Sequence, residues 1–577
     1  MLRTLAKSIR QYKWLSLISP ICVFFEAAFQ TLVPYLMAII IDRGVMVGNL
    51  HVIIRWGILL ICLALLGLAA GMGASWYSSK AAAGFAKNLR HDLYFHIQTF
   101  SFSDIDKFST SGLVTRLTTD ATNLQQAYQM TIRTALRAPL MLIFSVTMAF
   151  LVSPNIAWIF VVVIPILAVG LYAIIRSSRK LLTQVFHLYD RLNQVVGENI
   201  RGIRVVKIFV RAKTEIQKFQ TVAKNIFTVY SKAQRILALN QPLMQLIIGL
   251  STVSVAWLGA KLVVSRQLQI GQLMSLFSYT ISILTSLMML SNVFSQLILA
   301  GTSGRRVTAV LDTTTQLHSP ANGITTVNDG SISFEHVNFK FNDKEKQNAL
   351  TDINLQIKSG STVAVVGSTG SGKSTLVQLI PRLYDVDSGA VKVSGVNVKD
   401  YDLTTLRNAA AMVLQNNVLF SGTIKDNLRW GNPNATDEEL VQAAKIAQAD
   451  SFIEQFPDKY NTRIDQTGNN VSGGQRQRIS LARSLLKHPK ILLLDDATSA
   501  TDTETEHNIW QAMKANLPET TKVIITQRIT SITDADQIIV MENGRVSAIG
   551  THEQLLKDNA EYRSIYQIQI EGAKVNA

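Results

Sequence analysis

The chain has 577 residues, of which 48% are hydrophobic, and a formal net charge of +16 at pH 7. This length exceeds that of one domain, and the only two cysteines, Cys22 and Cys62, lie inside apolar segments, so the sequence implies no disulfide framework. The positive charge is spread along loops between long apolar runs, so it does not indicate a nucleic-acid-binding surface.

The first half of the chain contains apolar runs that carry almost no charges. A helix needs about 20 such residues to cross a bilayer. The run 138–175 is long enough for two crossings, with Ser153-Pro154-Asn155 as the turn between them. We therefore expect six membrane helices in a transmembrane domain over residues 1–310. The expected spans are residues 14–41, 56–79, 130–152, 156–176, 236–262 and 272–300.

Lys and Arg are concentrated in two long segments between these spans. Residues 176–235 carry 13 Lys/Arg against 3 Asp/Glu, and residues 80–137 carry 7 against 4. Because cytoplasmic loops carry the excess of Lys and Arg, we expect both loops and both chain termini to lie in the cytoplasm. Their helical periodicity predicts that they extend the membrane helices.

One acidic residue, Glu26, lies in the middle of the first span, with Gln30 one turn further on. An ionisable residue at this depth is costly and usually faces a cavity or a partner. Two interpretations stay open. Glu26 could attract cationic substrates in a substrate cavity, or it could make a hydrogen bond between helices.

The composition changes after the last span. Residues 311–330 are polar and contain Ser319-Pro320, which predicts a linker. From residue 331 to residue 577, strand and helix patterns alternate, which predicts an α/β domain. The expected strands are residues 332–341, 362–366, 491–494 and 522–526.

The strand expected at 362–366 leads into Gly-Ser-Thr-Gly-Ser-Gly-Lys-Ser, a phosphate-binding loop. Its glycines let backbone N–H groups surround phosphates, Lys373 reaches the terminal phosphates, and the Ser374 hydroxyl can ligate Mg²⁺. The loop alone indicates a nucleotide site and no particular function. The residues expected to bind the nucleotide here are Gly367, Ser368, Thr369, Gly370, Ser371, Gly372, Lys373, Ser374 and Thr375.

A second motif, Val-Ser-Gly-Gly-Gln at residues 471–475, resembles the signature of ATP-binding cassette (ABC) proteins. With both motifs in this order, nearly the whole chain resembles an ABC exporter half-transporter of the multidrug type. The segments 103–108 and 198–207 resemble the loop tips of these exporters, which dock short helices onto the ATPase domains. In that family the nucleotide sits between one subunit's phosphate loop and the other subunit's signature. The resemblance therefore implies a set of residues that serve a partner's site: Ser472, Gly473, Gly474, Gln475 and Asp502, the last in Ser-Ala-Thr-Asp.

The resemblance also implies ATP and Mg²⁺ as ligands and assigns further residues to them. Phe341 stands where the family has an aromatic residue that stacks on adenine. Gln415 matches a glutamine that touches Mg²⁺, and Asp495 matches the carboxylate that organises Mg²⁺. Together with Ser374, these two residues form the expected metal site.

Two positions depart from the family pattern. Asp496 stands where active members place the glutamate that polarises the attacking water, and Gln527 stands where they place a histidine that contacts the γ-phosphate. The shorter side chain draws the carboxylate back by about 1 Å, and such misplacement can cost roughly 100-fold in rate. Glutamine can hydrogen-bond but cannot carry a charge or transfer a proton. Together these departures predict the degenerate-site subunit of a bacterial heterodimeric ABC exporter.

The predicted function is ATP-driven extrusion of hydrophobic or amphipathic compounds across the bacterial cytoplasmic membrane. The expected partners are membrane lipids, a hydrophobic small-molecule substrate, and a second half-transporter with the catalytic glutamate and the switch histidine intact; no nucleic acid is expected. Hydrolysis is expected mainly at the composite site formed with that subunit. A lipid or peptide exporter, an importer built on the exporter fold, and an ATP-gated channel or regulatory subunit stay as alternatives.

Overall fold

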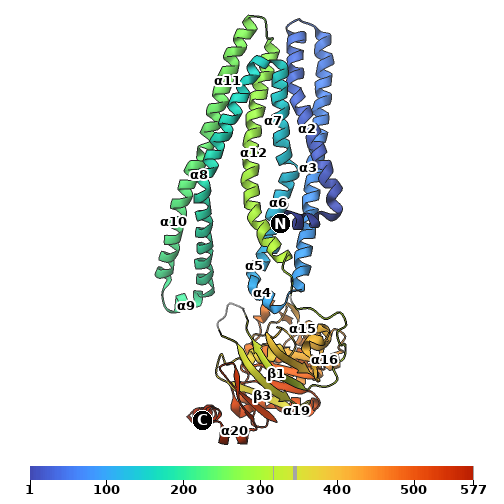
Figure 1. The fold of residues 1–577 in the computed structure, drawn as a ribbon, viewed down its shortest axis with the longest axis vertical. Helices are drawn as coiled ribbons and strands as arrows, with labels where there is room; N and C mark the ends of the chain where they lie inside the picture. The colour runs from blue at the N-terminus through green and yellow to red at the C-terminus, as the bar shows by residue number, and fades with distance from the viewer. Residues whose placement is uncertain (316, 342–346, 576–577) are drawn as a thin grey trace. The chain divides into compact units, whose positions relative to one another are not determined.

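The chain folds into two compact units, drawn in Figure 1. A computed structural model describes residues 1–315, 317–341 and 347–575. The helical unit comprises Met1–Gln98 and Thr110–Thr313. The α/β unit comprises Thr314–Ala577 and, from the first half of the chain, the short segment Thr99–Ser109.

The described part of the helical unit contains six segments that are long and apolar enough to cross a membrane, so the predicted number of membrane helices is confirmed. They are Leu2–Val45, Leu50–Gln98, Thr110–Val152, Pro154–Arg201, Ala212–Val264 and Ile270–Leu311. Several contain more than one helix. The elements in chain order are α1 (Leu2–Ala6), η1 (Lys7–Tyr12), α2 (Lys13–Ile39), η2 (Ile40–Val45), α3 (Leu50–Gln98), α5 (Thr110–Thr115), η3 (Arg116–Asp120), α6 (Ala121–Ile132), α7 (Thr134–Val152), α8 (Pro154–Arg201), α9 (Ile203–Ile208), α10 (Ala212–Ala238), α11 (Asn240–Val264) and α12 (Ile270–Leu311).

Small residues lie where these helices pack against one another. Ala27 on α2 and Ala74 and Ala81 on α3 are fully buried, which lets the two backbones approach closely. Large apolar side chains such as Trp14 and Leu65 point outward and are exposed. This distribution is the one expected of helices whose outer surface contacts lipid.

The turn predicted inside the run 138–175 is present. Helix α7 ends at Val152, Ser153 is extended with φ −156° and ψ 102°, and α8 begins at Pro154. Proline suits the first helical position because its missing N–H would have no partner there.

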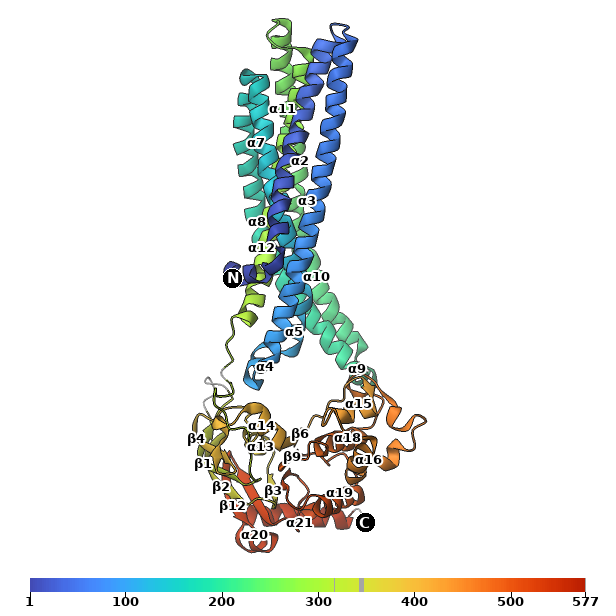
Figure 2. The same ribbon diagram turned by 90° about the vertical axis from the view of Figure 1, so that its right-hand side faces the viewer.

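The α/β unit is built on a six-stranded sheet in the order β12-β11-β3-β10-β9-β6, in which all neighbours except β12 and β11 run parallel. Figure 2 labels strands β12, β3, β9 and β6 of this sheet. A four-stranded antiparallel sheet, β2-β1-β4-β5, and a two-stranded sheet, β7-β8, complete the unit. The strands are β1 (Ile332–Phe339), β2 (Leu350–Ile357), β3 (Thr362–Gly367), β4 (Ser388–Val393), β5 (Val396–Asn397), β6 (Ala410–Val413), β7 (Gly422–Thr423), β8 (Arg463–Ile464), β9 (Ile491–Asp495), β10 (Thr521–Ile525), β11 (Gln537–Glu542) and β12 (Arg545–Gly550).

Helices and short turns cover these sheets. Strand β9 is buried along its whole length, which explains its unbroken apolar sequence. The helical elements of the unit are α4 (Phe102–Phe108), α13 (Lys373–Leu379), η4 (Val398–Asp400), α14 (Leu403–Ala409), α15 (Ile424–Arg429), α16 (Asp437–Ile446), α17 (Asp450–Ile453), η5 (Lys459–Asn461), η6 (Gln466–Gly468), α18 (Gly473–Leu485), α19 (Thr503–Asn516), η7 (Ile529–Ser531), α20 (His552–Asp558) and α21 (Ala560–Val575).

The first strand of this unit is shorter than predicted. Strand β1 ends at Phe339, which pairs with Leu350, and not at Phe341. The backbone N–H of Lys340 donates to the Asp387 carboxylate at 2.7 Å, so the chain has already left the sheet at this point.

The short helix α4 packs within the α/β unit. A capping box starts the helix, because Ser101 and Asp104 each accept a hydrogen bond from the other's backbone N–H. The Tyr384 hydroxyl donates to the Asp106 carboxylate at 3.1 Å, and the Phe102 ring lies 6.0 Å from the Tyr384 ring. The predicted loop tip at 103–108 is therefore a helix that contacts the domain carrying the phosphate loop.

Candidate nucleotide site

The phosphate loop connects β3 to α13 through left-handed glycines. Gly370 has φ +85° and Gly372 has φ +95°, conformations that favour glycine. A Cβ at Gly372 would also lie 2.9 Å from the Ala349 carbonyl oxygen. The loop thus turns its backbone at the N-terminus of a helix, an arrangement that suits anions.

Lys373 opens α13 and folds back over the loop. Its ammonium donates to the carbonyl oxygens of Gly367 at 3.0 Å and Ser368 at 2.8 Å. Burial lowers the pKa of Lys373, an effect that the carboxylates of Asp495 and Asp496 oppose. Two carbonyl oxygens of the loop therefore hold Lys373 Nζ in a confined place where terminal phosphates could bind.

Ser374 and Asp495 meet at the predicted metal site. The Ser374 hydroxyl donates to the Asp495 carboxylate at 2.9 Å. Burial raises the pKa of Asp495, and the hydrogen bond from Ser374 opposes this rise. Within the described residues, no cluster of three or more His, Cys, Asp or Glu could hold a metal ion. A hydroxyl and one carboxylate fit Mg²⁺, which is commonly bound by one or two carboxylates plus substrate phosphates.

Strand register brings the remaining predicted residues to the same edge of the sheet. Val413 of β6 pairs with Leu494 of β9, while Ile525 of β10 pairs with both Asp495 of β9 and Val365 of β3. The carboxyl ends of parallel strands form the usual ligand crevice of such sheets. The residues that follow these strands at this edge are Gln415, Asp496, Gln527 and the phosphate loop.

The backbone of Asp496 is held on both sides. Its N–H donates to the Ile525 carbonyl at 3.0 Å, and its own carbonyl accepts from Gln477 Nε2 at 3.3 Å and from Ser499 Oγ at 3.0 Å. Its φ of +52° is left-handed. Hydrogen bonds therefore tie the Asp496 backbone to β10, to α18 and to Ser499.

Phe341 lies just beyond β1 among other aromatic rings. Its centroid is 5.0 Å from that of Phe339 and 5.4 Å from that of Tyr384, both edge-on. The side chain is 44% exposed, so the ring offers a surface on which a flat base could stack.

The second motif forms the start of α18. Ser472 caps the helix, because its hydroxyl accepts from the Gln475 N–H at 3.2 Å while the Gln475 side chain accepts from the Ser472 N–H at 2.9 Å. Gly473 is exposed, whereas a Cβ on Gly474 would lie 2.7 Å from the Ala500 carbonyl oxygen. None of the hydrogen bonds among the described residues joins Ser472 to the phosphate loop of the same chain. Asp502 caps α19, accepting from the Thr505 N–H at 2.8 Å.

Glu26 does not stand alone in the helical unit. Its carboxylate pairs with Arg137 of α7 at 3.2 Å, and the same guanidinium donates to Gln30 at 3.0 Å. The sequence pattern places Arg137 at the end of a basic loop and contains no signal that links it to Glu26.

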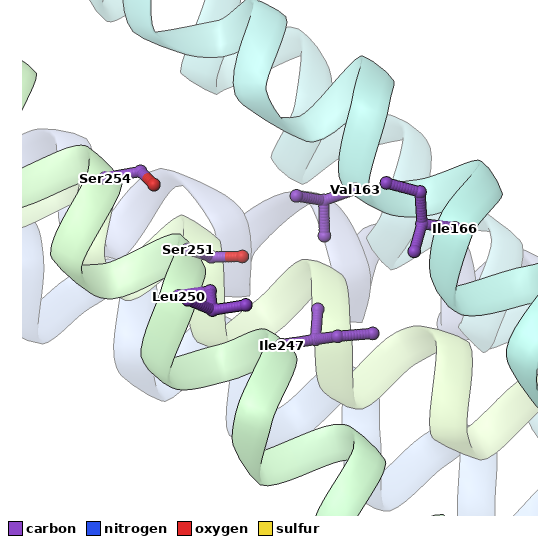
Figure 3. A pocket seen from close by; sticks show the side chains of 6 residues that line it. All are labelled: Val163, Ile166, Ile247, Leu250, Ser251 and Ser254. Atoms are coloured by element: carbon purple, nitrogen blue, oxygen red, sulfur yellow. The ribbon is translucent and has the colours of Figure 1, made fainter.

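A small apolar pocket lies between α8 and α11, whose side chains face each other across it in Figure 3. Its volume is about 120 Å³, well below the roughly 300 Å³ or more of sites for drug-sized ligands. The buried Ser251 hydroxyl has no hydrogen-bond partner in the described structure. The lining residues are Val163, Ile166, Ile247, Leu250, Ser251 and Ser254.

Several residues of the site carry no motif and were not predicted. Gln477 ties α18 to the loop after β9, donating to the Asp496 carbonyl and accepting from the Ala500 N–H at 3.1 Å. Arg528 donates to the buried Glu506 carboxylate at 2.9 Å. Both contacts join residues about 20 positions apart in the sequence. No local pattern links such residues, so only the folded structure reveals the contacts.

Comparison with known proteins identifies both units. Residues 16–288 match the family model described as the ABC transporter transmembrane region, and residues 350–499 match the model described as ABC transporter. The chain is 36% identical over 564 residues to the uncharacterized ABC transporter ATP-binding protein YfiB of Bacillus subtilis, covering 97% of both chains. It is 32% identical to the ATP-dependent lipid A-core flippase of Desulfotalea psychrophila, with 84% of each chain covered. It is also 32% identical to a Staphylococcus aureus protein that is provisionally named a multidrug export ATP-binding/permease protein. This match covers 86% of this chain and 85% of that protein.

Proposed function

Because the chain belongs to the ABC transporter family, as a multi-pass membrane exporter with its own ABC ATPase domain, we propose that it is one half of a bacterial heterodimeric exporter. In this proposal its own ATP site is degenerate, and its signature completes the hydrolytic site of a partner subunit. The proposed substrates are hydrophobic or amphipathic compounds.

The observation that carries this proposal is the anchored backbone of Asp496. Hydrogen bonds hold its N–H and its carbonyl, so the carboxylate stays about one methylene short of the position that a glutamate would reach. A misplacement of about 1 Å at a reacting group can cost roughly 100-fold in rate. Asp496 can still accept a hydrogen bond from water, but it holds that water in the wrong place.

Gln527 supports the same conclusion from the neighbouring strand. It follows β10 at the same edge of the sheet, and its side chain is exposed there. An amide can donate a hydrogen bond to a phosphate oxygen, but it supplies no charge and moves no proton. Nucleotide binding by this chain is thus retained, while its turnover at this site is slow.

The signature of this chain retains what a competent site needs from a partner. The capped N-terminus of α18 directs backbone N–H groups outward, and Gly473 leaves them exposed. In the proposed mechanism, these groups bind the γ-phosphate of ATP held by the partner. Lys373 binds the ATP phosphates on this side, and Ser374 and Asp495 would hold the Mg²⁺ that neutralises phosphate charge.

In this proposal, the motion that closes the two ATPase domains on ATP is transmitted to the membrane helices through segments such as α4. The hydrogen bond from Tyr384 to Asp106 and the aromatic contact with Phe102 provide such a connection. We infer that this connection lets the membrane helices alternate between inward- and outward-facing forms. A lipid is the second candidate substrate, because one relative of this chain is named a lipid A-core flippase.

The decisive experiment compares the purified chain alone with the chain co-purified with the product of a neighbouring half-transporter reading frame. We expect very low ATPase activity from the chain alone, because two of its signatures would face two of its own degenerate sites. Co-expression should restore turnover. Robust ATPase activity from a homogeneous homodimer would rule out the heterodimer.

A further inference from the structure

The last helix of the chain, α21, holds the loop that carries Gln527. The Gln569 side chain donates from Nε2 to the Gln527 carbonyl at 2.5 Å and accepts at Oε1 from the Ile529 N–H at 2.8 Å. Residues 527 and 569 are 42 positions apart. One side-chain amide thus bridges two backbone groups that lie two residues apart.

These backbone groups need such a partner because the chain leaves the sheet at this point. Strand β10 ends at Ile525, and the Arg528 N–H is already bonded to Thr526 Oγ1 at 3.0 Å. Backbone groups outside a ladder must find side chains or water as partners. An amide carries a donor and an acceptor side by side, so Gln569 satisfies both groups and sets the path of residues 527–529.

Arg528, between the two bonded residues, ties the same loop to a second segment. Its guanidinium donates to the Thr501 carbonyl at 3.1 Å and to the Glu506 carboxylate at 2.9 Å. Glu506 is 1% exposed and also accepts from Thr498 Oγ1 at 2.8 Å. The loop after β10 is therefore held from α21 on one side and from residues 498–506 on the other.

We propose that Gln569 is a positioning residue that holds Gln527 at the γ-phosphate end of this chain's ATP site. It does not contact the nucleotide. Its two hydrogen bonds fix the backbone of Gln527, and the Gln527 side chain then meets the terminal phosphate. This proposal rests on the proposed ATP site, and it adds the C-terminal helix to the parts that determine how that site distinguishes ATP from ADP.

The sharpest variant is Gln569→Glu. It keeps the size of the side chain and an acceptor for the Ile529 N–H, but it replaces the donor to the Gln527 carbonyl by an oxygen. The matched control is Gln567→Glu, because Gln567 is exposed on the same helix and the change in charge is identical. Gln569→Met, which removes both bonds at similar length, is the second variant.

Two measurements on the full-length chain in lipid nanodiscs test the proposal. Hydrogen exchange of the segment 526–532, followed by mass spectrometry, reports the loop directly; we expect exchange to become severalfold faster in both Gln569 variants and to stay unchanged in Gln567→Glu. Equilibrium binding of ATP and ADP reports the site. We expect ATP affinity to fall about fivefold in both Gln569 variants, as for the loss of one hydrogen bond, with ADP affinity unchanged.

Each outcome separates the proposals. Equal exchange in Gln569→Glu and Gln567→Glu would overturn the role of Gln569 in holding the loop. Faster exchange with an unchanged ratio of ATP to ADP affinity, or an equal loss of both nucleotides in both variants, would overturn its role toward the γ-phosphate. If the unaltered chain binds neither nucleotide, the proposed ATP site fails, and the exchange measurement still decides whether Gln569 holds the loop.

Discussion

Arg137 of α7 and Glu26 of α2 form an ion pair inside the helical unit, with 3.2 Å between Nη2 and Oε1. The same nitrogen reaches Gln30, so the two polar residues one turn apart on α2 share one cation. The second carboxylate oxygen of Glu26 and the Nε of Arg137 have no hydrogen-bond partner within the described structure. Of the two interpretations open for Glu26, this geometry favours contact between helices over a free anion that attracts cationic compounds.

The ion pair between Glu26 and Arg137 leads us to predict how a change at Glu26 affects transport. Glu26→Gln removes the only negative charge that pairs with Arg137 among the contacts described and keeps only an amide oxygen in its place, which weakens the contact between α2 and α7 whatever the substrate. We expect transport of a cationic dye and of a neutral dye to fall by the same factor in membrane vesicles. A loss confined to the cationic dye would instead assign Glu26 to substrate recognition.

The same pair makes a prediction about stability. Breaking a buried pair on one side costs about 3–5 kcal/mol, and the partial exposure of Arg137 reduces this to about 2 kcal/mol. We expect Glu26→Gln and Arg137→Gln each to lower the thermal unfolding midpoint, and the double variant to recover part of the loss. Additive losses in the double variant would show that the two side chains do not interact.

The signature and the phosphate loop of this chain should differ in how strongly their mutation lowers ATPase activity. In the proposed heterodimer, Ser472→Ala with Gly474→Asp should abolish steady-state ATPase activity at saturating Mg-ATP, because each lost donor to developing charge costs about 10²–10³-fold. Lys373→Ala should leave measurable activity if, as we propose, ATP on that side serves closure and not chemistry. Equal severity of the two changes would contradict the assignment of the degenerate site.

Gly473→Asp is a useful companion to that experiment. A Cβ at Gly474 would press on the Ala500 carbonyl oxygen at 2.7 Å, whereas at Gly473 the nearest atom is the Ala500 Cβ at 3.6 Å. Gly473→Asp therefore places the charge at the helix N-terminus without displacing the neighbouring loop. We expect it to be as damaging as the double variant if electrostatics, and not the clash, is the cause.

Restoring a single catalytic position should have a small effect. Asp496→Glu returns the missing methylene, but Gln527 still supplies neither charge nor proton. We expect turnover of the heterodimer to rise less than about tenfold, and Asp496→Glu with Gln527→His to raise it further. ATPase assays with the partner's own catalytic glutamate removed isolate this site. A full recovery from Asp496→Glu alone would show that Gln527 is no defect.

Tyr384 and Asp106 should couple ATP hydrolysis to transport. Burial, reinforced by the Asp106 carboxylate, raises the pKa of Tyr384 to about 12, so the phenol stays a neutral donor at every physiological pH. Because the pKa in the folded chain lies above the ordinary value near 10, the stabilisation is complete below about pH 10 and is lost between pH 10 and 12. Tyr384→Phe keeps the ring contacts and removes this bond.

We expect Tyr384→Phe to retain ATPase activity in the heterodimer and to lower the substrate transported per ATP by about tenfold, as for a lost hydrogen bond to a charged group. Asp106→Asn is the matched control, since its amide oxygen still accepts from the tyrosine and should preserve most of the coupling. Equal coupling in both variants would remove this bond from the transmission path.

Local patterns in the sequence were sufficient to predict much of this protein. The phosphate loop and the capped start of α18 are contiguous segments, so residues 367–374 and 471–475 carry their own geometry wherever they are placed. The apolar runs predict membrane helices because the bilayer imposes a length on each. Ser153-Pro154 marks the turn because proline suits the first position of a helix, where its missing N–H would have no partner.

Contacts between distant polar side chains depended on the tertiary structure alone. Gln569 meets the loop at Gln527, Gln477 anchors Asp496, and Arg137 neutralises Glu26, yet none of these side chains belongs to a periodic pattern or a motif. The end of β1 at Phe339 was missed for the same reason, since it depends on a bond from Lys340 to a carboxylate 47 residues away. A hydrogen bond needs two groups within about 3 Å, and only the packing of whole helices and strands decides which distant groups come that close.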